Sequence, residues 1–199
     1  MATIPLMEDF YSLQGEGYHS GRPAYFIRLA GCDVGCVWCD VKESWDKNAH
    51  PEVEISAIIQ RVKESGTDFV VITGGEPAMY DLTELTKALK EEGMEIAIET
   101  SGAYKLIGTF DWICLSPKKF KMPLEENYAL AQELKMIIFN KHDFQWSEEL
   151  KSKVAKDCKL YLQPEWDKAN EMLPLMLDYV KKNTNWTISL QTHKFLNIP

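Results

Sequence analysis

Short apolar stretches separated by helical patterns recur along most of this chain, and their alternation constrains the fold more than any other feature. The stretches have the length and composition of buried strands; they cover residues 24–29, 69–73, 95–99, 111–115, 134–138, 160–162 and 186–190. Helical patterns occupy residues 54–63, 82–91, 147–156 and 173–182, the last with Pro174 in its first turn. Gly66 and Gly93 stand where helix C-caps are expected. Strand-helix alternation predicts an α/β fold with mostly parallel strands, and at this length we expect a partial TIM-like βα barrel.

Composition limits the size and the partners of the protein. A chain of 199 residues with 45% hydrophobic content can bury one sizeable core, so we expect a single domain over residues 1–199. No apolar run approaches the roughly 20 residues that span a bilayer, which predicts a cytoplasmic protein. The net charge of −8 opposes binding to nucleic acid or to an anionic membrane, and favours a small-molecule substrate.

Polar or glycine-rich segments follow several of the predicted strands. The carboxyl ends of parallel strands share one rim, so these segments are expected to form one active site there. Turn residues at strand-helix junctions are the alternative explanation of each segment taken singly. The segments are residues 32–39, 74–77, 99–102, 116–118 and 163–164.

Three cysteines, Cys32, Cys36 and Cys39, are spaced C-x3-C-x2-C directly after the first predicted strand. Three thiolates leave one iron of a 4Fe-4S cluster without a protein ligand, and an open iron can bind a reactant. A zinc site completed by Asp40 or His50 is the alternative. The remaining cysteines, Cys114 and Cys158, lie in apolar contexts typical of buried small residues.

This cysteine loop, together with the segment Ile72-Thr73-Gly74-Gly75-Glu76-Pro77, resembles the radical S-adenosylmethionine (SAM) superfamily. Four further segments extend the resemblance over essentially the whole chain, to the family of 7-carboxy-7-deazaguanine synthases: residues 13–17, 99–102, 116–118 and 191–199. The resemblance implies a lyase that converts 6-carboxy-5,6,7,8-tetrahydropterin to 7-carboxy-7-deazaguanine with release of ammonia, on the route to queuosine. A radical derived from SAM would start the reaction, so the protein would mainly position reactants.

The resemblance also implies roles for individual residues. The cluster would be held by Cys32, Cys36 and Cys39. SAM would be held by Val37, Trp38, Cys39, Gly74, Gly75, Glu76, Ser101, Ser116, Pro117, Lys118 and Gln163. Glu76 is expected to accept from the SAM amino group, although it could also be an early-turn helix charge. Lys118 could instead be a solvated surface lysine.

On the substrate side, the resemblance assigns an N-terminal loop, strand residues and the chain end: Leu13, Gln14, Gly15, Arg28, Thr73, Glu99 and Pro199. Arg28 lies in an otherwise apolar strand, where its guanidinium needs a partner. That partner is either the substrate carboxylate or a protein acid. Gln191 and His193 could flank the pterin ring, or they could be structural.

The resemblance implies that the C-terminal segment closes over the substrate. The carboxylate of Pro199 would then accept hydrogen bonds from the guanidine-like edge of the substrate. Phe195, Leu196 and Ile198 are apolar enough to anchor this segment, and a tag beyond Pro199 is expected to weaken substrate binding.

The chain departs from the family pattern at one position that concerns Mg2+. In family members the residue after this Asp is commonly a Ser or Thr that helps to bind the ion, whereas this chain has Val41 after Asp40. Either Asp40, the substrate and water alone hold Mg2+, or the metal role has moved or weakened.

Two partners are implied by the resemblance, a flavodoxin-like electron donor and a second copy of the chain in a homodimer. Two other functions stay open from the residues themselves. The first is another radical SAM enzyme, such as an activase that makes a glycyl radical on a partner protein. The second is a non-catalytic zinc-binding module.

Overall fold

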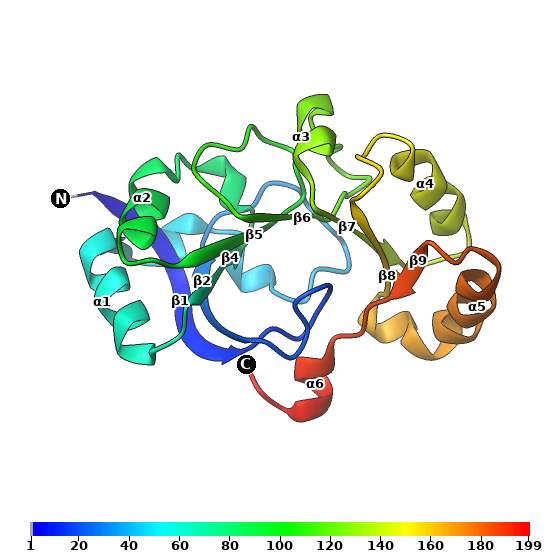
Figure 1. Cartoon of the computed structure of the whole chain (residues 1–199), viewed down its shortest axis with the longest axis horizontal. Coiled ribbons are helices and arrows are strands. Elements are labelled where there is room, and N and C mark those ends of the chain that lie inside the picture. The colour runs from blue at the N-terminus through cyan, green and yellow to red at the C-terminus, as the bar shows by residue number, and fades with distance from the viewer. Residues whose placement is uncertain (1) are drawn as a thin grey trace.

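A nine-stranded sheet that curves into an open barrel forms the framework of the protein (Figure 1). This computed structural model describes residues 2–199. The strands lie in the order β3-β1-β2-β4-β5-β6-β7-β8-β9. From β2 onward all neighbours are parallel, whereas β1 pairs antiparallel with both β2 and β3. The predicted α/β class and partial βα barrel are therefore confirmed. The strand bounds are β1 Thr3–Leu13, β2 Pro23–Leu29, β3 Glu52–Glu54, β4 Phe69–Gly74, β5 Glu95–Thr100, β6 Trp112–Leu115, β7 Glu133–Ile138, β8 Lys159–Pro164 and β9 Trp186–Ile188.

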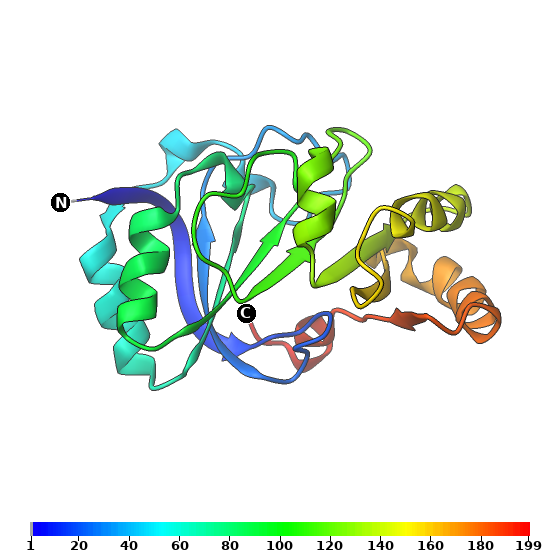
Figure 2. The ribbon, with the colours of Figure 1, turned by 45° about the horizontal axis from the view of Figure 1, so that its top comes forward.

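Helices cover the convex side of the sheet, and a short C-terminal helix lies apart from them near the opening (Figure 1). Figure 2 places this last helix beside the loop that follows β1. The helices are α1 Ile55–Ser65, α2 Thr83–Glu91, α3 Glu125–Leu130, α4 His142–Lys151, α5 Ala169–Lys182 and α6 Thr192–Leu196. No helix within residues 2–199 combines the length and the apolar character that a membrane crossing requires.

Each central strand presents alternate residues to the two faces of the sheet. Outward residues such as Ile27 and Ile72 pack with α1 and α2 in one core, and α3, α4 and α5 cover a second core beside β7 and β8. Inward residues Phe26, Val71 and Ala97 form a smaller core inside the barrel. One step further along the same strands, the inward positions are polar, and those positions build the site.

Several elements differ from the sequence-based expectation. The strand β1 was not predicted, because its sequence mixes polar and apolar residues and most of its residues after Leu6 are only partly buried. The helix expected at residues 147–156 begins earlier, at His142, because Asp143 accepts from the backbone N–H groups of Phe139 and Asn140 and fixes the start. The last predicted helix also begins earlier, so Pro174 lies inside α5 rather than in its first turn. Gly66 adopts the left-handed C-cap conformation that was expected, with φ 73°.

Candidate active site

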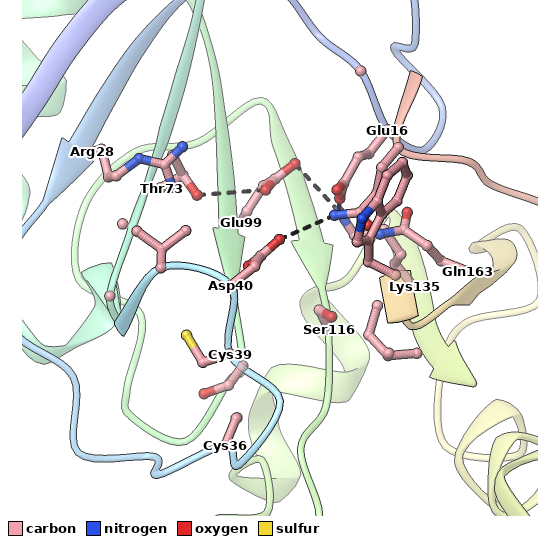
Figure 3. A pocket seen from close by; sticks show the side chains of 18 of the residues that line it. Glu16, Arg28, Cys36, Cys39, Asp40, Thr73, Glu99, Ser116, Lys135 and Gln163 are labelled. Atoms are coloured by element: carbon pink, nitrogen blue, oxygen red, sulfur yellow. Dashed lines mark hydrogen bonds and ion pairs between the residues drawn. The ribbon is translucent and has the colours of Figure 1, made fainter. Parts of the chain in front are cut away.

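A cavity of about 440 Å3 lies where the parallel strands end (Figure 3). Strands from both halves of the sheet reach it, together with the cysteine loop and the C-terminal segment. The polar segments that follow separate strands in the sequence therefore share one space. Of the predicted site residues, those that line it are Leu13, Gln14, Gly15, Arg28, Cys32, Cys36, Trp38, Cys39, Asp40, Thr73, Gly74, Gly75, Glu76, Glu99, Ser101, Ser116, Lys118, Gln163, Gln191, His193 and Pro199. Val37 and Pro117 do not, and the side chain of Val37 is exposed.

Three free thiols on the loop after β2 line this cavity: Cys32, Cys36 and Cys39. Within residues 2–199, no three His, Cys, Asp or Glu side chains converge on a position for one metal ion. A 4Fe-4S cluster instead spreads its cysteine ligands over separate irons. Both candidate fourth ligands of a zinc site have other partners, since Asp40 accepts from Lys194 Nζ at 2.8 Å and His50 Nε2 lies 2.8 Å from Glu43 O. The donor set fits a cluster better than a zinc ion.

The cysteine loop is held at its base and at its outer side. Gly31 N–H donates to Ser44 O at 2.6 Å, which fixes the start of the loop. Asp33 accepts from Tyr104 Oη at 2.5 Å and from Lys121 Nζ at 2.8 Å. Burial raises the pKa of Cys36 to about 11, so an incoming metal must displace the thiol proton there.

The paired glycines after β4 are required by the protein itself. A Cβ on Gly74 would lie 2.2 Å from Leu29 O, and one on Gly75 would lie 2.3 Å from Gly31 O. Gly75 N–H donates to Leu29 O at 2.9 Å, so the ends of β2 and β4 are in close backbone contact. The glycines thus bring the main chain of β4 beside the cysteine loop.

Glu76, the next residue, is buried and accepts hydrogen bonds from its own protein. Oε1 accepts from Ala78 N–H at 3.0 Å and from Thr100 Oγ1 at 2.5 Å. Oε2 accepts from Ser101 N–H at 2.8 Å and also from the Ser101 hydroxyl. These four donors match the acceptor capacity of a carboxylate. Glu76 therefore ties the end of β4 to the end of β5, and its expected contact with SAM stays a prediction.

Arg28 has a protein partner, as one of its two predicted interpretations requires. Its Nε donates to Glu8 Oε1 on β1 at 2.7 Å. The contact is made through Nε, and the side chain still lines the cavity (Figure 3). A guanidinium has five donors, so Glu8 and a ligand carboxylate can share it.

The floor of the cavity holds a lysine between two carboxylates (Figure 3). Lys135 Nζ lies 2.5 Å from Glu16 Oε2 and 3.5 Å from Glu99 Oε1. Gln14 Nε2 donates to Glu99 Oε1 at 3.0 Å, and Thr73 Oγ1 lies 3.5 Å from Glu99 Oε2. Burial alone would raise the pKa of Glu16, but the Lys135 ammonium outweighs burial and lowers that pKa to about 2.

Two predicted SAM residues are held by local contacts at the rim. Lys118 Nζ donates to Ser116 O at 2.6 Å and to Ser116 Oγ at 2.7 Å. Lys118 thus folds back over the end of β6 and is only partly exposed, so the solvated-surface interpretation is wrong. Gln163 at the end of β8 is buried and accepts from Ser189 Oγ at 2.7 Å.

The C-terminal segment is anchored by polar contacts. Thr192 donates through its N–H and its hydroxyl to Gly15 O, each at 2.9 Å. Lys194 and Gln191 both donate to Asp40, which directly follows the last cysteine. Phe195 is 67% exposed and Leu196 is 59% exposed, so the expectation that these two side chains anchor the segment is wrong, whereas Ile198 is half-buried.

The structure also brings forward residues that the sequence reasoning did not assign to the site. They are Glu16, Lys135, Glu165, Trp166 and Lys194, with aromatic residues around them. For Lys135 a signal was present, because a lone cation in an apolar strand had already drawn attention to Arg28. Glu16 lies inside a recognised motif but was given no role. Lys194 had no such signal, since its partner Asp40 is distant in sequence.

Comparison with known proteins gives consistent matches. The model of the radical SAM superfamily matches residues 26–113. A 7-carboxy-7-deazaguanine synthase from Flavobacterium psychrophilum is 55% identical over 196 residues, which is 98% of this chain and 93% of that protein. One from Synechocystis is 48% identical, over 98% of this chain and 94% of that protein. The crystal structure of QueE from Escherichia coli superimposes with a TM-score of 0.84 at 31% identity, covering 94% of this chain and 93% of that chain.

Proposed function

The chain belongs to the 7-carboxy-7-deazaguanine synthase family of the radical SAM superfamily, and on that premise we propose that it converts 6-carboxy-5,6,7,8-tetrahydropterin to 7-carboxy-7-deazaguanine with release of ammonia. The proposal rests on one observation, which is that the predicted cluster ligands and the predicted substrate residues line the same cavity. A loop with three free thiols meets Arg28 and the carboxylates of the floor within it. An activase acting on a partner protein has no need of such an enclosed set of charges.

The residues of the cavity divide between cofactor and substrate. Cys32, Cys36 and Cys39 would hold the cluster, and the rim residues Ser101, Ser116, Lys118 and Gln163 would hold SAM. When bound, the cluster and SAM supply an organic radical that removes a hydrogen atom from the substrate. The chain has to fix the substrate in one orientation and keep other reactants away.

Substrate orientation follows from the charges on opposite sides of the cavity. Arg28 would bind the pterin carboxylate through the donors that Glu8 leaves free. Gln14 and Glu99 would bind the polar edge of the ring at the floor. The segment with His193 and Pro199 would cover the substrate, because it already lies against Gly15 and the cysteine loop.

The side chains at the expected Mg2+ position do not fit a divalent ion. Asp40 is paired with the Lys194 ammonium and accepts from Gln191, and Val41 offers no oxygen. Mg2+ prefers oxygen ligands in a nearly octahedral arrangement. We therefore assign no step of the reaction to Mg2+ in this protein.

The same proposal includes the partners and setting implied by the family. Residues 1–199 would act as one radical SAM domain, working as a homodimer. A flavodoxin-like protein would supply electrons to the cluster. A cytoplasmic location suits the thiolate ligands, because thiols stay reduced there.

An anaerobic assay of the reconstituted protein tests the proposal. With SAM, a reductant and 6-carboxytetrahydropterin, we expect the deazapurine and ammonia in equal amounts, detected by mass spectrometry and an ammonia assay. Cys36→Ala should lose iron, sulfide and activity, whereas Cys158→Ala, in the core beside α5, should keep all three. Treatment with a chelator of Mg2+ should leave the rate unchanged.

Two results would contradict the proposal in different ways. Cleavage of SAM without deazapurine formation would retain the superfamily but reject this substrate. Protein that contains zinc and lacks iron and sulfide after reconstitution would reject radical chemistry altogether. A further result bears on the Mg2+ assignment alone: a rate that falls on chelation and recovers with Mg2+ would show that an ion binds despite Val41.

A further inference from the structure

Lys135 lies in the middle of β7, with its side chain on the inner face of the barrel. Its side chain is only 5% exposed, although an ammonium is normally kept in water. On both sides of it in the sequence, Leu134 and Met136 point outward into the core beneath the helices. A buried lysine in such a strand is costly unless its partners compensate the charge.

The compensation comes from two different parts of the chain. Glu16, on the loop after β1, lies 2.5 Å from the ammonium, and Glu99, at the end of β5, lies 3.5 Å from it. Lys135 and Gln14 approach Glu99 at the same oxygen, Oε1. The other oxygen, Oε2, has only the long contact of 3.5 Å with Thr73 Oγ1 among the described residues. Glu99 is thus held through Oε1, while Oε2 remains available to a ligand in the cavity that Glu99 lines.

The charges on this floor do not cancel. Glu16 and Glu99 carry two negative charges against the single positive charge of Lys135. Burial raises the pKa of Glu133 and of the Cys114 thiol and lowers the pKa of His193, so burial opposes the charged form of each of these neighbours. A buried floor with one excess negative charge is complementary to a ligand edge that donates hydrogen bonds.

We propose that Lys135 is a positioning residue for substrate recognition, which holds Glu16 and Glu99 together and directs the free oxygen of Glu99 at N–H donors of the pterin ring. This inference rests on the proposed function. It assigns to Lys135 no contact with the reacting atoms. The lysine joins the N-terminal loop to the sheet and fixes the carboxylate that reads the ring.

The test compares four variants of the cluster-loaded protein under anaerobic conditions. Lys135→Met removes the charge and Lys135→Arg keeps it. Lys63→Met is the matched control, because it removes an ion pair with Glu92 on the helical surface. The double variant Glu16→Gln with Lys135→Met leaves one negative charge on the floor, as in the wild type, but lacks the bridge, and it guards against misfolding from uncompensated charge. Measurements are KM for the pterin, KM for SAM and the EPR spectrum of the reduced cluster with SAM.

For Lys135→Met we expect the pterin KM to rise about 10- to 100-fold, as for the loss of a charged hydrogen-bond arrangement, with the SAM KM and the EPR spectrum unchanged. Lys135→Arg should recover part of the loss, Lys63→Met should match the wild type, and the double variant should stay impaired. Raising the pH should also recover part of the loss in Lys135→Met, because carboxyls without the cation hold protons to higher pH.

Several results would overturn the inference. An unchanged pterin KM in Lys135→Met would remove the role. Recovery in the double variant would show that the lysine only balances charge. Equal losses for pterin and SAM would indicate general damage to the cavity. A wild type that binds no pterin would instead reject the proposed function, so the two failures are distinct.

Discussion

Glu76 is a carboxylate whose four hydrogen-bond donors all come from its own protein. The donors lie on the turn after β4 and at the end of β5, so the residue joins two adjacent loops of the rim. Sequence reasoning placed Glu76 at the cavity, and it does line the cavity. The hydrogen bonds of Glu76 to Thr100 and Ser101 could not be predicted from the sequence, because they depend on how closely the ends of β4 and β5 approach each other.

We expect Glu76→Gln to destabilise the protein by about 2–4 kcal/mol, because the amide NH2 would face a donor that needs an acceptor. The melting temperature of the cluster-loaded protein should fall by roughly 5–15 °C. Glu91→Gln, at an exposed position ending α2, should change stability by less than about 0.5 kcal/mol. Equal melting temperatures for the two variants would contradict the internal role of Glu76.

The helix α6 and the loop after β1 come from opposite ends of the chain and lie side by side (Figure 2), and both contribute residues to the lining of the cavity. Neither element was predicted as it occurs. α6 has only five residues, which is too short for a periodic pattern, and the loop looked like a lead-in to the first strand because β1 was missed. The buried parallel strands were easier to predict, since continuous apolar runs are their direct signature.

Substitution of Gly15 tests this contact between elements. A Cβ on Gly15 would lie 2.2 Å from His193 Nδ1, so Gly15→Ala should displace α6 from the loop. We expect a several-fold higher KM for the pterin and a smaller change in the KM for SAM, because the glycines after β4 are not touched and α6 reaches the cysteine loop only at its end, through Asp40. The melting temperature should change little, since α6 has no fully buried residue. Steady-state kinetics would measure this, and an unchanged pterin KM would mean that the tail does not cover the substrate.

At the scale of the whole molecule, the pair of Lys135 and Glu16 links the N-terminal loop to the far half of the barrel. The fold class could be predicted because the strand-helix alternation is local in the sequence. The link could not be predicted, because Glu16 and Lys135 meet only after the sheet has curved. The stability of the molecule should therefore depend on the ionisation of this pair.

The pH dependence of stability follows from the lowered pKa of Glu16. A carboxyl with a pKa of about 2 when folded and 4.5 when unfolded stabilises the folded state above pH 4.5, on the order of 3 kcal/mol, and loses this contribution as the pH falls toward 2. We expect Glu16→Gln to have a lower melting temperature at pH 7 and a shallower fall between pH 4.5 and 3. Calorimetry of both proteins, each without the acid-labile cluster, measures this. Parallel curves for the two would contradict the prediction.

The sheet of the open barrel has two edge strands, β3 and β9, and each has only three residues. An edge strand can pair with another chain through its unpaired backbone N–H and C=O groups and so begin aggregation. Short edge strands offer few such groups, and Glu52 and Glu54 add negative charge to β3. The barrel can therefore stay open for its substrate without presenting a template on which misfolded copies could stack.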